Sequence, residues 1–201
     1  MPADAVLRSL RHLWVTLEPL KLPMAVIGGI ALAAWKHVRA TRDVGLLLGI
    51  AEHDLNDVFG RLRAAEIRPK HDPPVRSVGE LDVVQLLYEP PETFLDLQID
   101  LLLARSGYHL DALERRIPTQ LPDLDIEIAV LACEDMILHK LVSGRIIDRV
   151  DAAALLRANR GTLNLGYLAL RTHTLDIGKE YAHVWNDAFP GEPVPNTEEG
   201  W

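Results

Sequence analysis

Two adjacent glycines and three aspartates are the residues of this sequence whose types and spacing could do chemistry. Gly28 and Gly29 follow a short apolar run and precede an alanine-rich segment, the pattern of a tight turn between a strand and a helix. Such a turn lets a phosphate approach backbone N–H groups, although glycine pairs are also common at purely structural turns. Asp43 heads a second apolar run about fifteen residues later, and Asp96 and Asp100 lie on a further one. The sequence therefore predicts a turn suited to phosphate, with carboxylates on strands near it.

The elements that must position these residues follow from the spacing of apolar side chains. Leucines and Trp14 recur every three or four residues between positions 7 and 20, which predicts a first helix. A second helix is predicted at 55–65, and short apolar runs predict strands at 24–27, 44–50, 81–88, 94–103 and 124–130. The strands at 81–88 and 94–103 are expected to pair antiparallel. Along the latter, alternation places Leu95, Leu97 and Ile99 on one face and Asp96, Gln98 and Asp100 on the other.

The pattern changes to helical from Ala132 to about Trp185, with breaks near Gly144 and Gly161. We therefore expect an α/β (α+β) fold, with a small mixed and largely antiparallel sheet, flanking helices and a C-terminal helical part. The expected divisions are a core with its N-terminal helix at 1–130, helices packed on that core at 131–188, and a polar tail at 189–201. The absence of a flexible linker in the sequence is the reason to expect that the helical part packs on the core.

Charge and composition narrow the possible functions. The 29 acidic and 21 basic residues give a formal net charge of −8, which argues against coating nucleic acid or anionic membrane through bulk charge. The balance is uneven, because residues 176–201 hold six acidic residues and one lysine, whereas 59–76 hold five basic and two acidic residues. A single cysteine, Cys133, favours a reducing cytoplasm. The apolar stretch 22–35 is too short to span a membrane and does not have the position of a signal peptide.

Five short motifs in order make the sequence similar to a known superfamily. It resembles the nucleotidyltransferases with a DNA polymerase β-like catalytic domain, and within them the AbiEii-like toxin branch and related uncharacterised proteins. The pattern is an apolar strand, a G-G/S-x-A turn, an R-x-T-x-D-x-D strand, a third carboxylate on a neighbouring strand, an E-D-L/M-x-x-x-K-L helix and an R-x-x-D-x-x-D segment. The matching residues are Gly28–Ala31, Arg39–Asp43, Asp100, Glu134–Leu141 and Arg145–Asp151.

This resemblance implies a site that binds an NTP with Mg²⁺ or Mn²⁺. It assigns Asp43 and Asp100 as catalytic metal ligands, and Asp96, on the same strand face as Asp100, as a further candidate ligand. Metal ions at such a site neutralise the triphosphate and stabilise the leaving pyrophosphate. The residues that the resemblance implies for nucleotide binding are Gly28, Gly29, Thr41, Lys140, Arg145 and Asp148.

The sequence departs from the pattern at one position, because Gly45 stands where the second aspartate of D-x-D belongs. Three interpretations of the missing aspartate stay open. The site could work with one metal ion, another residue could supply the missing ligand, or the site could bind nucleotide without turning it over. On the later helix, the stem of Lys140 is expected to pack while its ammonium reaches out, either to phosphate or to solvent. Arg145, Asp148 and Asp151 have the three-residue spacing of a charge set on a helix surface.

The function that follows is transfer of a nucleotidyl group from an NTP to a hydroxyl of RNA, most specifically a tRNA end, or of a protein. By its resemblance the chain is toxin-like and is expected to have a cognate antitoxin, with no membrane partner. One alternative is a degraded relative that acts as a binding or regulatory module, for which Gly45 is the sequence evidence. Another is a small-molecule nucleotidyltransferase that modifies antibiotics.

Overall fold

A computed structural model describes residues 3–50, 55–78, 81–121 and 124–195 of the chain. The end of the predicted polar tail, 196–201, lies outside the described residues. The chain divides into two compact units, Met1–Ala31 with Arg39–Leu131, and Leu32–Val38 with Ala132–Trp201. We call them the sheet unit and the helical unit and describe each by itself. The domain boundaries expected from the sequence stay a prediction.

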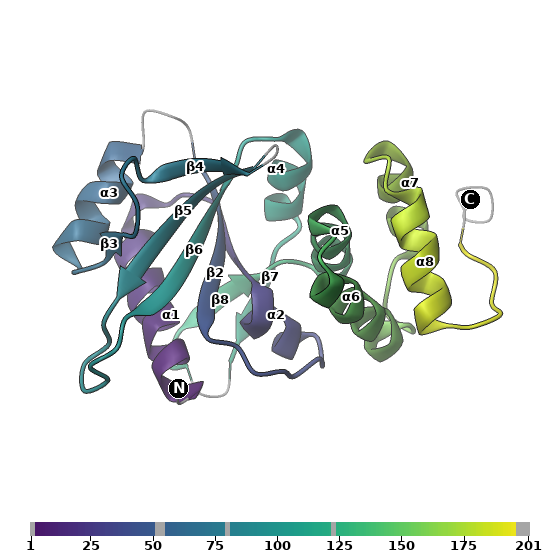
Figure 1. The fold of residues 1–201 in the computed structure, drawn as a ribbon, viewed down its shortest axis with the longest axis horizontal. Coiled ribbons are helices and arrows are strands. Elements are labelled where there is room, and N and C mark those ends of the chain that lie inside the picture. The colour runs from purple at the N-terminus through teal and green to yellow at the C-terminus, as the bar shows by residue number, and fades with distance from the viewer. Residues whose placement is uncertain (1–2, 51–54, 79–80, 122–123, 196–201) are drawn as a thin grey trace. The chain divides into compact units, whose positions relative to one another are not determined.

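The sheet unit is built on one mixed sheet of eight strands (Figure 1). Seven strands follow the order β3-β5-β6-β2-β1-β8-β7, and β4 pairs with β5 beside β3. The β2–β6 and β1–β8 pairs are parallel, and the remaining pairs are antiparallel. The bounds are β1 Met24–Ile27, β2 Asp43–Gly49, β3 Arg68–Pro69, β4 Val75–Val78, β5 Leu81–Tyr88, β6 Leu97–Ala104, β7 Ile117–Gln120 and β8 Glu127–Val130.

Apolar side chains cover one face of this sheet and fix its strands. α1 (Ala3–Leu17) contacts both α3 (Leu55–Ala64) and β2, and its buried residues include Leu10, Leu13 and Leu17. Along β6 the odd-numbered side chains from Leu97 to Leu103 are buried and the even-numbered ones are partly exposed. This alternation leaves Gln98 and Asp100 on the less buried face. A further helix, α4 (Gly107–Glu114), contacts β2.

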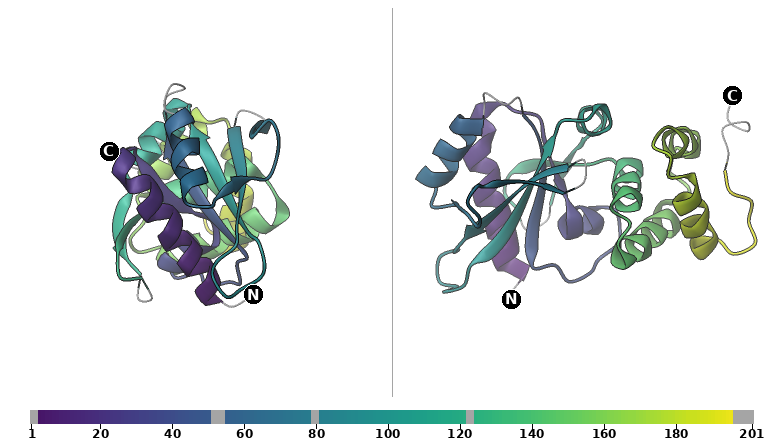
Figure 2. Two further views of the ribbon diagram at one scale, coloured as in Figure 1. Left: turned by 90° about the vertical axis from the view of Figure 1, so that its left-hand side faces the viewer. Right: turned by 45° about the horizontal axis from the view of Figure 1, so that its top comes forward.

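Besides residues 32–38, the described part of the helical unit contains the four helices after β8, which Figure 2 shows from two further sides. They are α5 (Cys133–Ser143), α6 (Ile146–Asn159), α7 (Leu165–Thr174) and α8 (Gly178–Ala188). α6 packs against both α5 and α8, and α7 contacts α5 and α8. Gly144, with φ of +66°, ends α5 in a left-handed cap, the conformation for which glycine is best suited.

Most of the expected elements are confirmed, and the differences have simple causes. The first helix, the five strands, the antiparallel β5–β6 pair and the helical breaks after Ser143 and Asn159 are present. Placing Leu95 in the buried row was wrong, since β6 begins at Leu97 and Leu95 is 59% exposed. The sequence pattern did not predict β3, β4, β7 and α4, because two- and four-residue strands and one short helix carry too few apolar repeats.

Candidate functional site

The Gly28–Gly29 turn needs glycine at each position for a different reason. β1 ends at Ile27 and α2 (Gly28–Ala34) begins at once, with Gly28 in the left-handed region at φ +70°. A Cβ at Gly28 would meet no atom within 4 Å, so the surface beside the turn is open. At Gly29 a Cβ would lie 2.5 Å from Cβ of Thr41 and 2.6 Å from its Oγ1. The lack of a side chain at Gly29 therefore lets the turn pack directly against Thr41.

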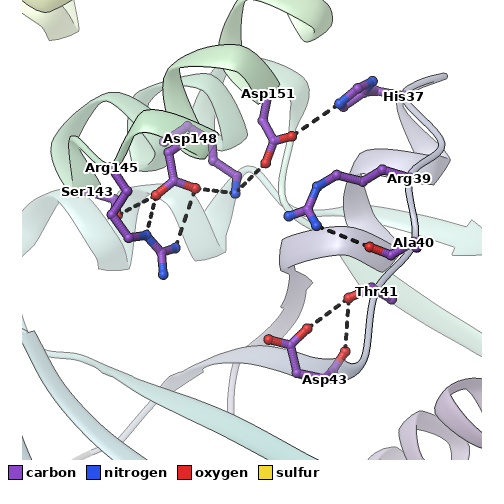
Figure 3. A network of polar contacts seen from close by, with 10 residues as sticks. His37, Arg39, Ala40, Thr41, Asp43, Ser143, Arg145, Asp148 and Asp151 are labelled. Carbon is purple, nitrogen blue, oxygen red and sulfur yellow. Dashed lines mark hydrogen bonds and ion pairs between the residues drawn. The ribbon is translucent and has the colours of Figure 1, made fainter. Parts of the chain in front are cut away.

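Thr41 in turn holds the first candidate carboxylate. Its Oγ1 donates a hydrogen bond of 2.8 Å to Oδ1 of Asp43, the first residue of β2, and the two side chains point toward each other in Figure 3. Asp43 is exposed, so its carboxylate stays hydrated and available to a ligand. Thr41 thus contacts both Gly29 and Asp43, and it links the glycine turn to the carboxylate. Three of the predicted site residues are brought together here.

Replacing Gly29 by alanine tests this contact. The added methyl overlaps the Thr41 side chain, so we expect Gly29→Ala to lower the free energy of unfolding by about 1–3 kcal/mol. The matched control is Gly60→Ala in α3, where a Cβ meets nothing within 4 Å and alanine is expected to raise stability by about 0.5–1 kcal/mol. Urea denaturation of both variants decides the matter. Equal stability changes would contradict the close contact.

Asp100, the second candidate carboxylate, lies on β6 and is held by two amides. Nε2 of Gln85 donates to its Oδ1 at 3.1 Å, and Nε2 of Gln98 donates to the same oxygen at 3.0 Å. Nζ of Lys70 can only donate, and it contacts Oε1 of Gln98 at 2.7 Å, which fixes the amide nitrogen of Gln98 toward Asp100. Nε2 of His71 lies 3.0 Å from Oε1 of Gln85, and it donates to this oxygen in the tautomer that carries its proton on Nε2. Among the described residues, Oδ2 of Asp100 accepts no hydrogen bond.

Burial raises the pKa of Asp100 above its usual range, and the nearby charge of Asp43 adds to this. The amides of Gln85 and Gln98 and the charge of Lys70 lower the pKa and offset part of the rise. A carboxylate with a raised pKa is a stronger base than an ordinary aspartate. Its raised pKa also means that the ionised Asp100 lowers the free energy of unfolding at neutral pH.

That cost predicts a stabilising substitution. Asp100→Asn keeps the shape and the acceptor Oδ1 but removes the charge, so we expect a higher free energy of unfolding at pH 7. A raised folded-state pKa costs stability above that pKa, and the cost disappears as pH falls through it. The gain should therefore shrink between pH 7 and pH 3, as read from urea denaturation at both values. A gain that is constant with pH would contradict the assigned cause.

Gly45 lies between the two carboxylates on the same sheet face. It follows Asp43 by two residues along β2 and pairs directly with Asp100 across the parallel β2–β6 ladder. On its other side it pairs with Ile27 of β1. A Cβ at Gly45 would lie 2.9 Å from Cγ1 of Ile27 and 3.3 Å from its carbonyl oxygen. The place of the missing aspartate is therefore filled by the Ile27 side chain.

Asp96 is engaged elsewhere. It precedes β6, and its Oδ2 accepts a 2.6 Å ion pair from the guanidinium of Arg68. Four strand residues separate Asp96 from Asp100, roughly 13 Å along an extended chain. No group of three or more His, Cys, Asp or Glu side chains in the described ranges is arranged to hold a metal ion. The role of Asp96 as a metal ligand stays a prediction.

The helical unit buries the residues predicted there. Lys140 of α5 is 3% exposed, and its Nζ lies 2.5 Å from Oδ1 of Asp148 and 2.9 Å from Oδ2 of Asp151. Asp148 and Asp151 of α6 are fully buried, and Figure 3 shows their side chains with the polar contacts around them. Our expectations of an ammonium that reaches out and of a charge set on the helix surface were wrong. The cause is that α6 packs on α5, so the two aspartates face Lys140.

Three more groups complete this network. The Arg145 guanidinium and Ser143 Oγ both bond Asp148, and Nε2 of His37 lies 3.1 Å from Oδ1 of Asp151. Burial alone would raise the pKa of Asp148, but the hydrogen bonds from Arg145, Lys140 and Ser143 outweigh it and lower the pKa to about 2. The predicted nucleotide-binding residues Lys140, Arg145 and Asp148 are thus brought together as partners of one another.

The first turn of α5 also has partners that the sequence did not show. Glu134 accepts a hydrogen bond from the backbone N–H of Asn164, and buried Asp135 accepts one from the Tyr167 hydroxyl at 2.7 Å. These two bonds fasten the start of α7 to α5. Cys133, just before them, is buried, and burial together with the charge of Glu134 raises the pKa of its thiol to about 12. A thiol with so high a pKa stays protonated at neutral pH and is a poor nucleophile.

The site residues that sequence reasoning missed are Gln85, Lys70, His71 and Ile27. A signal for the glutamines was present, since Gln98 alternates with Asp100 on one strand and Gln85 lies in the partner strand. The pairing register that brings Gln85 opposite Asp100 is long-range, so no local pattern reports it. For Ile27 the signal was only that an apolar residue precedes the glycine pair.

The fold is similar to that of several solved structures. JHP933 from Helicobacter pylori gives a TM-score of 0.53 at 14% identity, over 92% of this chain and 82% of that one. An antigenic nucleotidyltransferase-like protein from Paracoccidioides brasiliensis gives 0.53 at 14% identity, over 94% and 98% of the two chains. TM1012 from Thermotoga maritima gives 0.52 at 17% identity, over 78% and 93%. These likenesses confirm the expected fold class, a mixed α/β nucleotidyltransferase-like fold with a C-terminal helical part.

Neither models of protein families nor curated proteins give a significant match to the sequence. Within the described ranges, every helix is too short or too polar to cross a lipid bilayer.

Proposed function

We propose that the chain is a Mg²⁺-dependent nucleotidyltransferase whose catalytic carboxylates are Asp43 and Asp100. The observation that carries this proposal is their placement on one face of adjacent parallel strands, next to the open Gly28–Gly29 turn, in a nucleotidyltransferase-like fold. Strand geometry separates their Cα atoms by roughly 8 Å, which lets both side chains reach a common ligand.

The donor set fits a magnesium ion. Mg²⁺ is usually held by one or two protein carboxylates, with water and substrate phosphates completing its octahedron. Asp43 is exposed, and Asp100 keeps Oδ2 without a protein donor among the described residues, so both carboxylates are available. When bound, the ion neutralises the triphosphate and stabilises the leaving pyrophosphate.

The chain's own groups account for the rest of the reaction. The backbone at Gly28 and Gly29 receives the phosphates, and Thr41 keeps Asp43 oriented. Asp100 acts as the general base that accepts the proton of the acceptor hydroxyl. The acceptor oxygen then forms a bond to the α-phosphorus while the bond from that phosphorus to pyrophosphate breaks. Lys140, Arg145 and Asp148 stay predictions as nucleotide ligands.

The acceptor that we propose is RNA, most specifically a tRNA end. A cavity of about 630 Å³ beside α3 and β3 is lined by Phe59, Arg63, Arg68 and Pro69, among others. Guanidinium groups bind phosphates, and an aromatic ring offers a base a surface on which to stack. Such an activity is toxin-like, so induced expression should arrest growth, and a co-expressed antitoxin should relieve the arrest.

Transfer of label tests the function. The purified chain is incubated with each α-labelled NTP, Mg²⁺ or Mn²⁺, and total tRNA, protein extract or an aminoglycoside, beside Asp100→Asn. We expect labelled RNA from the native chain and none from Asp100→Asn, whose expected gain in stability excludes unfolding as the cause. Label on protein or on the aminoglycoside, and none on RNA, would mean that RNA is not the acceptor. Equal label with Asp100→Asn would contradict the proposed site.

A second candidate function is a binding module that holds nucleotide without transferring it. The filled position beside Gly45 favours it, because the site lacks one carboxylate of the family pattern. Calorimetry that shows NTP binding, together with no label on any acceptor, would support this function over the first.

A further inference from the structure

The position of Gly45 decides how many metal ions the carboxylates could share. Directly paired strand residues are about 5 Å apart, and residues two apart along a strand about 6.6 Å. Two positions on this face are therefore next to both Asp43 and Asp100: position 45, and position 98, where the amide oxygen of Gln98 already accepts a hydrogen bond from Lys70. A carboxylate at position 45 would touch ions held by either neighbour, whereas glycine supplies no oxygen from a side chain.

The space beside Gly45 is also closed to a replacement ligand. Cγ1 of Ile27 lies 2.9 Å from where a Cβ would stand, and Ile27 is 4% exposed. Gly45 has ordinary strand backbone, so the closest contact against a larger residue is the isoleucine side chain, followed by the Ile27 carbonyl oxygen at 3.3 Å. The amide oxygen Oε1 of Gln98, on the same sheet face, already accepts a hydrogen bond from Lys70.

We propose that the site takes one divalent cation, held by Asp43 and Asp100, and that Ile27 occupies the place where a bridging carboxylate would stand. This inference rests on the proposed function for the identity of the site. It departs from a two-ion arrangement, in which two ions about 3.5–4 Å apart clamp the attacking and leaving oxygens. The Ile27 side chain then fills the space that the missing side chain of Gly45 leaves.

The test counts Mn²⁺ bound to the native chain, without nucleotide, by equilibrium dialysis and electron paramagnetic resonance. We expect one Mn²⁺ per chain with the spectrum of an isolated ion, and loss of that ion in Asp43→Asn. Asp72→Asn, an exposed carboxylate of the 71–74 loop, is the matched control and should keep it. Two magnetically coupled ions, or none, in the native chain would overturn the proposal.

Restoring the aspartate provides the second arm. Gly45→Asp combined with Ile27→Ala should bind two coupled ions, whereas Ile27→Ala alone should still bind one. One ion in a double variant whose circular dichroism is native would overturn the role given to Ile27. The native count decides the proposal even where the double variant fails to fold. Because no arm needs turnover, absent label transfer with one bound Mn²⁺ would refute the function and leave this inference standing.

Discussion

Replacing Lys140 by methionine is expected to lower the free energy of unfolding by about 3–5 kcal/mol, although methionine fills nearly the same volume. The ammonium is the cation between two fully buried carboxylates, those of Asp148 and Asp151. Arg145, Ser143 and His37 still contact these carboxylates, but removing the ammonium leaves their negative charge less compensated where water cannot reach it, which is the costly way to break a buried ion pair. Lys179→Met in α8 is the matched control, because Lys179 is exposed and its loss should change stability by less than about 0.5 kcal/mol.

The pH dependence separates this cause from a packing defect. The lowered pKa of Asp148, about 2 in the folded chain, gives stability that is present above the ordinary aspartate pKa and lost as pH falls through 2. In Lys140→Met the carboxylate has lost one of its donors, so less of that stability exists to lose. The difference between native and variant chains should narrow from pH 5 to pH 2 in urea denaturation. A constant difference would mean that packing, not charge, sets the effect.

Lys140 also shows where sequence reasoning stops. The apolar residues of 133–143 predicted a helix correctly, and a lysine beside an apolar seam is ordinarily one with a solvated head. Whether such a lysine is buried depends on which residues of the next helix face it. Asp148 and Asp151 lie on α6, and only the packing of α6 on α5 turns them inward. The spacing of apolar residues predicts that a segment is a helix, but it does not predict which residues of a neighbouring helix will face it.

The sheet was more predictable, because the alternation of buried and exposed side chains is local along each strand. The alternation of Gln98 and Asp100 with buried Leu97 and Ile99 gave the correct face, and the glycine pair gave the turn. The hydrogen bonds around Asp100 were not predictable, since Gln85 reaches Asp100 from β5 and Lys70, which follows β3, orients the amide of Gln98. The two-residue strand β3 that places Lys70 is too short to leave a periodic signal.

Asp43→Asn is expected to reduce kcat/KM for nucleotidyl transfer by about 10³-fold while leaving the fold intact. A metal ligand contributes several kcal/mol of transition-state stabilisation, and each 1.36 kcal/mol is a factor of ten in rate. Asp43 is exposed at the start of β2, and asparagine can still accept the Thr41 hydrogen bond, so no packing is lost. The thermal midpoint should therefore stay within about 2 °C of the native value.

Thr41→Val should give a smaller loss of kcat/KM than Asp43→Asn. Valine removes the hydroxyl that orients Asp43 but keeps a side chain of similar size against Gly29. We expect a loss of about tenfold in kcat/KM, on the order of one hydrogen bond to a charged group. The loss should lie mainly in kcat, since the carboxylate remains and only its orientation changes. Asp72→Asn should retain native rates. Rates for Asp43→Asn within threefold of native would mean that this carboxylate does not touch the reacting groups, whatever nucleotide the turn binds.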